Sequence, residues 1–220
     1  MFNFSVYQEL TCIAEGSGQF YCRVGAMVAY KGNFTSEKVL LDPNSRNQGL
    51  LRSVMNLASR KLTGENIPLM RVSGSGTYYM ANRARHISVI TLEPGQSIGV
   101  ESENLLAFTE DCKYGVRFIG VGVVSQKGLF TTNLTAIGKN PQVVITTEGN
   151  PIVLETPCVV DPDAVVCWTG PDPQFKFDVN WKTFIGQSSG ESYCFEFTQP
   201  GEIVIIQPSE RISGLDIGID

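Results

Sequence analysis

Residues 193–208 read YCFEFTQPGEIVIIQP, two apolar runs separated by the turn residues Pro200 and Gly201. Two earlier stretches have the same plan: PLMRVSGSGTYYMA at 68–81 and FTTNLTAIGKNPQVVITT at 130–147. Runs rich in β-branched and aromatic residues, interrupted by Gly or Pro, are typical of strands joined by tight turns. Each stretch therefore predicts a β-hairpin, and together they predict an all-β, antiparallel protein.

A second feature recurs in the same order, an apolar run that ends in an aromatic residue. The runs AMVAY, LLAF and VVCW end at Tyr30, Phe108 and Trp168. An acidic residue and a Gly-containing turn precede each run, starting at Glu15, Glu93 and Glu148. Recurrence at one position favours a core packing site over a ligand pocket lined by these rings. Two markers repeated in one order indicate tandem copies of one strand-rich unit.

The repeats divide the chain into three antiparallel β units, at residues 1–84, 85–141 and 142–212, with a C-terminal tail at 213–220. We expect these units to pack as one compact body in a pseudo-threefold arrangement. Residues 46–62 depart from the β pattern, because apolar side chains recur there at helical spacing: Leu50, Leu51, Val54, Met55, Ala58 and Leu62. This predicts one short amphipathic helix in the first unit, covering an end of the sheet core; a membrane-surface or partner-docking helix is the alternative.

The composition argues against several classes of protein. Hydrophobic residues make up 42% and charged residues 18% of the 220 residues, which is typical of a globular protein and not of a disordered one. The net charge of -5 makes nucleic-acid binding unlikely without a local basic stripe. No run approaches the ~20 apolar residues of a membrane span, and the N-terminus lacks an export or transit signal. We therefore expect a cytoplasmic protein of the bacterial type.

The six cysteines are scattered without CxxC or CxxH spacing and stand at positions 12, 22, 112, 158, 167 and 194. Several lie among apolar neighbours, as small core residues do. We predict reduced, structural thiols; a disulfide pair or a zinc site is the alternative.

His86 is the only histidine, so any Ser-His-Asp or Cys-His arrangement must use it. It directly precedes an apolar strand-like run, which favours a strand-edge histidine over a catalytic base. Arg83 and Arg85 stand beside it and make this the densest cationic spot outside the predicted helix. The spot is a candidate anion or phosphate site, or else a solvated flank of a hairpin.

Three further patterns have both a functional and a structural interpretation. Glu65 and Glu191 follow equivalent repeat glycines, which suggests paired carboxylates for acid-base work or a hard cation, or structural hydrogen bonding. Asp161 and Asp163 flank a proline and are typical of turn formers. Residues 73–76, SGSG, superficially match a phosphate loop, but they precede a strand and not a helix, which favours a hairpin turn.

With these repeats the chain resembles the altered inheritance of mitochondria 24 family, over about residues 7–210. The segments that carry the resemblance are GAMV at 25–28, LEPGQSIGVES at 92–102, DPDAV at 161–165 and the closing run 186–210. The resemblance implies a TRAP-like fold, similar to the tryptophan RNA-binding attenuation protein: small antiparallel β units, sandwich-like or double-stranded β-helix in form, that assemble into rings. It implies no established biochemical activity.

Three functions stay open. The favoured one is a non-enzymatic oligomeric scaffold or binding protein of unknown ligand; three units per chain suggest a homo-oligomer, with a trimer favoured. The second is an RNA- or small-ligand-responsive regulator, by analogy of fold. The third is a hydrolase or metal-dependent enzyme. We predict no catalytic residues, no metal site and no cofactor, and the binding residues and the protein or small-molecule partner stay unknown.

Overall fold

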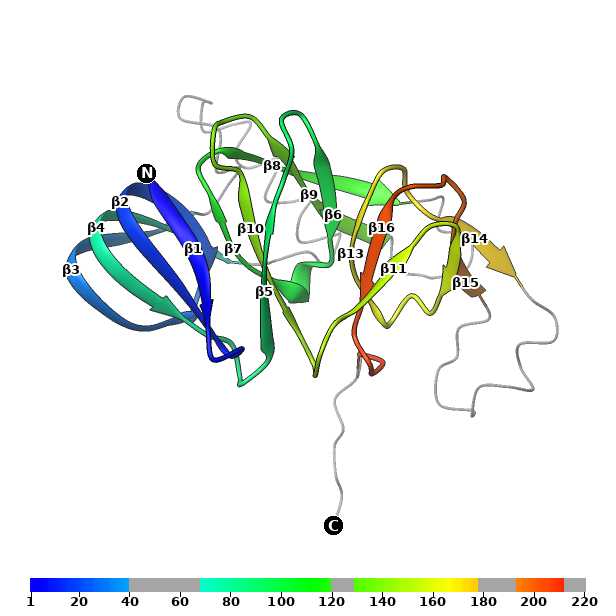
Figure 1. Ribbon diagram of the computed structural model, residues 1–220, viewed down its shortest axis with the longest axis horizontal. Coiled ribbons are helices and arrows are strands. Elements are labelled where there is room, and N and C mark those ends of the chain that lie inside the picture. Colours follow the sequence, from blue (N-terminus) through cyan, green and yellow to red (C-terminus); the bar gives the residue numbers. More distant parts are fainter. Residues whose placement is uncertain (40–67, 120–128, 178–192, 212–220) are drawn as a thin grey trace, which may run out of the picture.

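The computed structural model describes residues 1–39, 68–119, 129–177 and 193–211 of the chain (Figure 1). These residues form sixteen β-strands and one short 3-10 turn, Ser102–Asn104, and every strand pairing among them is antiparallel. The predicted all-β, antiparallel class is confirmed. The helix expected at 46–62 lies outside the described residues.

The largest sheet has seven strands in the order β3-β4-β2-β7-β10-β5, with β1 paired to β2 beside this path. It covers the left and centre of Figure 1. The bounds of its strands are β1 Phe2–Tyr7, β2 Thr11–Arg23, β3 Met27–Val39, β4 Leu69–Met80, β5 His86–Thr91, β7 Leu105–Thr109 and β10 Gln142–Thr147.

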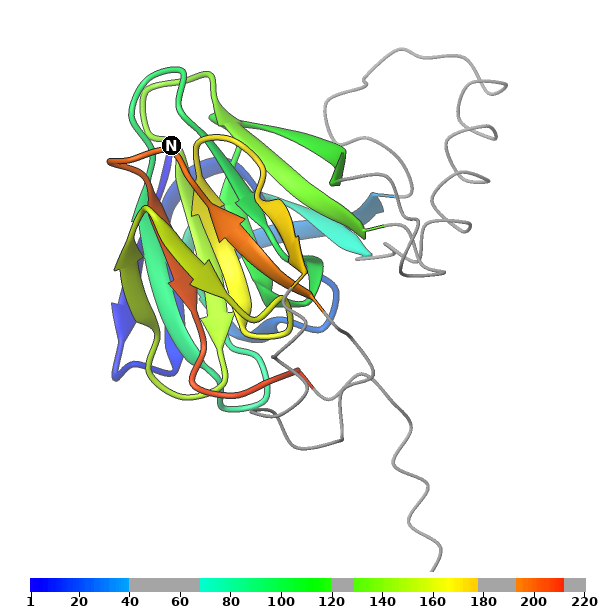
Figure 2. The same ribbon diagram turned by 90° about the vertical axis from the view of Figure 1, so that its right-hand side faces the viewer.

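The other two sheets contain the remaining strands. A six-stranded sheet has the order β11-β16-β13-β6-β9-β8, and a three-stranded sheet has the order β12-β15-β14. Figure 2 views the molecule from the end that carries β11–β16. The bounds are β6 Ser97–Val100, β8 Cys112–Ile119, β9 Leu129–Ala136, β11 Ile152–Glu155, β12 Cys158–Val160, β13 Val165–Thr169, β14 Gln174–Phe177, β15 Tyr193–Phe197 and β16 Ile203–Ile206.

Strands β5–β10 and strands β11–β16 pair in the same way. In the earlier set β10 lies between β5 and β7, and β9 lies between β6 and β8. In the later set β16 lies between β11 and β13, and β15 lies between β12 and β14. One strand of each set also pairs with an earlier strand outside its own set: β7 pairs with β2, and β13 pairs with β6. Each of these two pairs joins two sets of strands into one continuous sheet.

The three stretches predicted to be hairpins do not pair as hairpins. Residues 69–80 form one continuous strand, β4, so the Ser73–Gly76 segment is not a turn. The segments after β9 and after β15 do reverse the chain, but β9 and β10 belong to different sheets, and so do β15 and β16. A tight turn between apolar runs fits either arrangement, because the turn residues do not determine the partner of each strand.

Two glycines allow β4 to bend where a turn was expected. Gly74 and Gly76 have φ angles of +154° and +130°. A Cβ atom on Gly74 would lie 2.0 Å from the carbonyl oxygen of Asn33, and one on Gly76 would lie 2.1 Å from that of Lys31. Only glycine lets the backbones approach so closely. The strand therefore keeps its pairing with β2 and β3 along its whole length.

The core consists of three apolar clusters between and within the sheets. Phe108 is fully buried and stacks on Tyr21, with ring centroids 5.0 Å apart, and Trp168 is 1% exposed. Both residues confirm the prediction that the recurring aromatics pack in the core. Tyr30 does not, because it is 53% exposed. β3 pairs only with β4 among the described strands, so nothing described covers the outer edge on which Tyr30 lies.

We expect Gly74→Ala to lower the free energy of unfolding by about 3 kcal/mol or more, because the new Cβ would overlap the Asn33 carbonyl oxygen. Urea denaturation measures the change. Gly115→Ala is the control, since its Cβ would have no closer neighbour than the Asn133 carbonyl oxygen at 3.7 Å, and we expect it to change stability by less than ~0.5 kcal/mol. Equal effects of the two substitutions would contradict the steric explanation.

Candidate functional site

The cationic spot predicted at residues 83–86 gains a further arginine in the structure. Arg85 forms an ion pair with Glu148, and Arg83 is exposed in a turn with a φ of +49°. Arg23, at the end of β2, donates a hydrogen bond from Nη1 to the Glu103 carbonyl oxygen at 2.8 Å. Burial lowers the pKa of Arg23, Glu103 raises it, and Arg85 and Arg83 lower it further, so the three guanidinium groups share one region.

Two of the three guanidinium groups in this basic region are already bonded to other groups of the protein. Glu148 neutralises Arg85 and also accepts a hydrogen bond from Ser209 Oγ at 3.3 Å. Arg23 is held by a backbone oxygen. Arg83 is left as an exposed guanidinium for which no partner is found in the described part of the chain. One exposed cation next to two carboxylates is a weak anion site compared with a convergent cluster.

His86 opens β5, opposite Thr147 of β10. Its Nδ1 atom is buried and has no hydrogen-bond partner among the described residues. A catalytic histidine needs a carboxylate to orient it and a nucleophile within hydrogen-bond reach, and the described residues place neither at this ring. The structure therefore favours the strand-edge interpretation of His86 over that of a general base.

The other predicted residues are placed as follows. Asp161 acts as a turn former, because its Oδ1 accepts a hydrogen bond from the backbone N–H of Asp163 at 2.8 Å and its carbonyl oxygen accepts one from Ala164 N. That prediction is confirmed. Glu65 and Glu191 lie outside the described residues.

None of the six cysteines forms a disulfide, and five of them are buried, with Cys158 partly exposed. Burial raises the pKa of Cys12 and Cys22 to about 12 and that of Cys112 to about 11, and it also raises the pKa of Cys158 and Cys167. A thiol with a raised pKa is protonated at neutral pH and is a poor nucleophile and a poor metal ligand. The cysteines thus behave as small core residues.

The most tightly bonded polar cluster surrounds Arg211. Its Nη1 donates to the Val165 carbonyl oxygen at 2.8 Å and to Asn104 Oδ1 at 3.1 Å, and its Nη2 donates to the Pro162 carbonyl oxygen at 2.8 Å. Asn104, fully buried, donates in turn to the Thr146 carbonyl oxygen at 2.8 Å. These bonds tie the end of the described chain to both sets of strands, β5–β10 and β11–β16.

Glu101 lies beside this cluster, with an oxygen 3.8 Å from Arg211 Nη1. Burial raises the pKa of Glu101 to about 7; Arg211 opposes this rise, while Glu103 and Asp163 add to it. Its carboxyl group therefore titrates near neutral pH. Sequence analysis did not single out Glu101 or Arg211, because the two are far apart in the chain and neither belongs to a recognisable motif.

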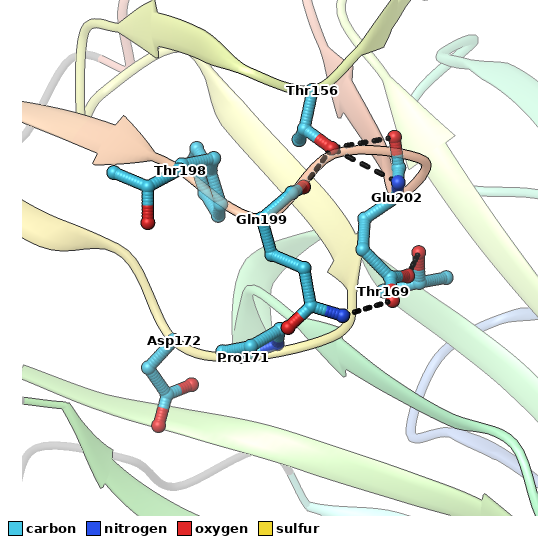
Figure 3. Close-up of a pocket in the computed structure, with 8 residues that line it drawn as sticks. Thr156, Thr169, Pro171, Asp172, Thr198, Gln199 and Glu202 are labelled. Carbon is cyan, nitrogen blue, oxygen red and sulfur yellow. Dashed lines mark hydrogen bonds between the residues drawn. The ribbon is translucent and has the colours of Figure 1, made fainter.

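A shallow pocket with a cavity volume of about 20 Å³ lies at one end of the β11–β16 set, between three turns (Figure 3). The pocket is lined by four polar residues whose side chains form hydrogen bonds mainly with one another: Thr156, Thr169, Gln199 and Glu202. The Glu202 carboxylate accepts hydrogen bonds from Thr169 Oγ1 and from Gln199 Nε2, the second at 3.1 Å. A pocket of this volume has room for about one water molecule and is far smaller than the ~300 Å³ or more that is usual for ligand sites.

Asp172 also lines the pocket, but it serves a junction between strand sets. Its Oδ1 lies 2.7 Å from Arg117 Nη2 of β8. Burial raises the pKa of Asp172, whereas Arg117 and Trp168 lower it. The pocket thus offers no free charged group, and its polar residues have a structural role at the turns.

Within the described ranges, no group of three or more His, Cys, Asp or Glu side chains is arranged to hold a metal ion. The same ranges contain no helix with the length and apolar character that crossing a membrane requires. What the described surface does offer is an exposed apolar strand. Met27, Val28 and Tyr30 of β3 are 49%, 63% and 53% exposed.

We expect stability to fall as the pH rises from about 4.5 to 8, with Glu101 as one cause. The pKa of Glu101 is higher in the folded chain than its ordinary value, so its contribution is fully present below pH 4.5 and is lost as the pH rises through 7. Glu101→Gln should therefore be more stable than wild type by about 1–3 kcal/mol at pH 8, and the difference should shrink at pH 5. Urea denaturation at both pH values measures this.

Glu93→Gln is the control for this prediction, because Glu93 is an exposed carboxylate in the turn before β6. It should leave the pH dependence of wild type unchanged. A Glu101→Gln variant that loses stability at pH 8 would show that the charged carboxylate stabilises the fold through Arg211, against the stated effect of burial.

Comparisons with known proteins address the fold and the family. The chain is similar to an X-ray crystal structure of a Streptococcus pyogenes protein determined by a structural genomics consortium, with a TM-score of 0.66 and 17% sequence identity. The alignment covers 96% of this chain and 94% of that one. At this identity the likeness concerns the fold alone. No curated protein matches the chain.

The family comparison covers nearly the whole chain. The model described as mitochondrial biogenesis AIM24 matches residues 3–209, which include every described strand except the first residue of β1. The resemblance noted from the sequence is confirmed, and the chain belongs to the AIM24 family.

Proposed function

We propose that this protein is a non-enzymatic, homo-oligomeric β scaffold or binding protein, built from three tandem TRAP-like units and favouring a trimer. The observation that carries the proposal is the repeated junction between strand sets, which leaves one matching strand exposed at the start of the chain. The ligand or partner that such a scaffold would present stays open, as does its cytoplasmic location, since the family description refers to mitochondrial biogenesis.

Equivalent strand pairing supports the three-unit description. One pairing pattern is shared by the six strands β5–β10 and the six strands β11–β16. In the first unit, each of the long strands β2, β3 and β4 takes the place of two of these six strands. The starts of β2 and β3 flank Met80 of β4, whereas their second halves flank Val72. The same β-bulge interrupts β3 after Met27, β7 after Leu105 and β13 after Val165. Bulges are specific local features, so the three bulged strands are equivalent positions.

This description shifts one predicted boundary. Residues 142–147 form β10, which pairs with β5 and β7, so the second unit of the proposal extends to residue 147 and not to 141. One junction repeated from unit to unit remains part of the proposal, whereas the two ends of the array lie apart, so a closed pseudo-threefold arrangement within one chain does not.

The chemistry of the described residues supports a non-enzymatic role. Five of the six thiols are buried, and burial raises the pKa of Cys12, Cys22 and Cys112. His86 lacks a catalytic partner among the described residues, and the carboxylates near the pocket and the Arg211 cluster are engaged in structural bonds. An active site usually combines a pocket with perturbed and partly free titratable groups. Here Glu101 lies away from the pocket, and Asp172, the carboxyl group with a raised pKa that lines the pocket, is held in an ion pair with Arg117.

An RNA- or ligand-responsive regulator is the second candidate, favoured by Arg23 joining Arg83 and Arg85 in one basic region. The neighbouring Glu103 and Glu148 and the net charge of -5 weigh against it. A hydrolase or metal-dependent enzyme is the least supported candidate.

We expect purified protein to have a solution mass well above the 24.1 kDa of one chain, and about three times that mass if the trimer forms. Exposed edge strands with apolar side chains favour association over a monomer. Size-exclusion chromatography with light scattering measures the mass. A single species at 24.1 kDa over a range of concentrations would overturn the proposal.

We expect no salt-dependent retention of single-stranded RNA at low salt, because one exposed arginine cannot provide several phosphate contacts. Fluorescence anisotropy with a labelled oligonucleotide measures binding. Retention that weakens with salt and is lost in Arg83→Ala would instead favour the regulator. Lys139→Ala, which removes an exposed cation elsewhere on the surface, is the matched control.

A further inference from the structure

We infer that the outer edge of β3 in one copy pairs with β12 of a second copy, antiparallel, with Lys31 opposite Val160. This rests on the proposed function and identifies the surfaces through which the scaffold assembles. Within the described residues β3 pairs only with β4, and β12 pairs only with β15, so each has one strand edge without a described partner.

The first observation is a difference in burial among three equivalent strands. All five residues of β7 are buried, and four of the five residues of β13 are buried with the fifth partly so. The matching residues of β3, Met27–Lys31, are all exposed. These residues are nonetheless apolar up to Tyr30, like their counterparts. β3 is therefore an apolar strand that is exposed, although its two counterparts, β7 and β13, are buried.

The second observation explains what covers the two buried strands. β7 pairs with β2 of the preceding unit, and β13 pairs with β6 of the preceding unit. In these pairs Phe108 lies opposite Tyr21, and Trp168 lies opposite Gly99. The indole occupies the space that a side chain on Gly99 would need, since a Cβ there would lie 2.8 Å from two ring atoms. Tyr30 is the third aromatic, and no described strand pairs with the outer edge of β3 on which it lies.

The third observation is a matching free edge at the other end of the chain. Val160, the last residue of β12, holds the place in its unit that Phe20 of β2 and Ile98 of β6 hold in theirs, because each of the three is paired with the central strand of its set. Phe20 pairs with Val72, Ile98 with Leu134, and Val160 with Phe195, and all six side chains are buried. β6 and β2 each pair with a strand of the following unit, whereas β12 pairs only with β15 among the described strands.

The register of the new pair follows from the two existing ones. Phe20 lies opposite Thr109, the residue after Phe108, and Ile98 lies opposite Thr169, the residue after Trp168. The residue after Tyr30 is Lys31, and Val160 is the counterpart of Phe20 and Ile98. Repeating the junction therefore places Lys31 of one copy opposite Val160 of the other.

The geometry favours a second copy of this chain, and not an unrelated protein, as the partner of these two strand edges. The chain carries both halves of the junction and displays them at opposite ends, with β3 at the left of Figure 1 and the β12-β15-β14 sheet at the right. The contact uses two different surfaces, so it is heterologous and continues from copy to copy until a ring closes. It is also continuous with the two junctions already present within the chain.

The first test replaces the exposed aromatic. Tyr30→Lys should reduce the solution mass from that of the oligomer to the 24.1 kDa of one chain, because a charge would enter an apolar edge. Tyr7→Lys is the matched control, since Tyr7 is also 53% exposed but lies on β1. It should keep the oligomer. Circular dichroism and urea denaturation check that both variants are folded.

A second test does not depend on disrupting the protein. Chains with Lys31→Cys are mixed with chains with Val160→Cys, both in a Cys158→Ser background, so that a disulfide between the new thiols must be intermolecular. Opposed residues on antiparallel strands place their Cβ atoms ~4.5–5.5 Å apart, close enough for cross-linking. Replacing Val160→Cys by Val159→Cys is the control, because neighbouring residues point to opposite sheet faces. Non-reducing electrophoresis should show dimer bands with the first pair only.

The outcomes separate this inference from the proposed function. Loss of the oligomer in Tyr30→Lys together with selective cross-linking at Val160 supports the inference. A wild-type oligomer that survives Tyr30→Lys and gives no cross-link overturns the inference but leaves an oligomeric scaffold standing. A monomeric wild type overturns both.

Discussion

Hydrogen bonding along strand edges is the constraint on which this structure depends. A strand whose edge faces water leaves a row of N–H and C=O groups open to any other strand. The chain resolves this twice in the same manner, by adding β7 to β2 and β13 to β6. Each addition extends a sheet and buries one aromatic residue, so backbone pairing and core formation are achieved by a single contact.

The polar clusters of the protein follow from these same junctions. Arg211 and Asn104 connect β5–β10 with β11–β16, and the ion pair of Arg117 with Asp172 connects the same two sets at another point. Buried polar groups are expensive unless bonded, so their partners must be supplied wherever sheets meet. This explains why the strongest electrostatic effects, such as the raised pKa of Glu101, occur at a junction and not in the pocket.

Local patterns in the sequence were sufficient to predict strands, turns and recurring positions, but not strand partners. The aromatics at 108 and 168 were assigned to the core correctly because their apolar surroundings are local. The SGSG segment was assigned to a turn, yet it is the bend of a long strand, because glycines at positive φ serve both purposes. Arg23 and Glu101 were missed, since their significance depends on residues brought close only by the fold.

The error at Tyr30 is the most informative one. Its sequence context is that of a core residue, and the two equivalent aromatics are buried, so the pattern itself was interpreted correctly. What differs is the partner strand: β7 and β13 each pair with a strand of the preceding unit, whereas the outer edge of β3 has no partner among the described strands. A terminal unit of a tandem array must either acquire polar residues on its outer strand or be covered by another molecule. β3 keeps the apolar residues Met27, Val28 and Tyr30 on that strand. The burial of its counterparts therefore argues that the fold is complete only when copies meet.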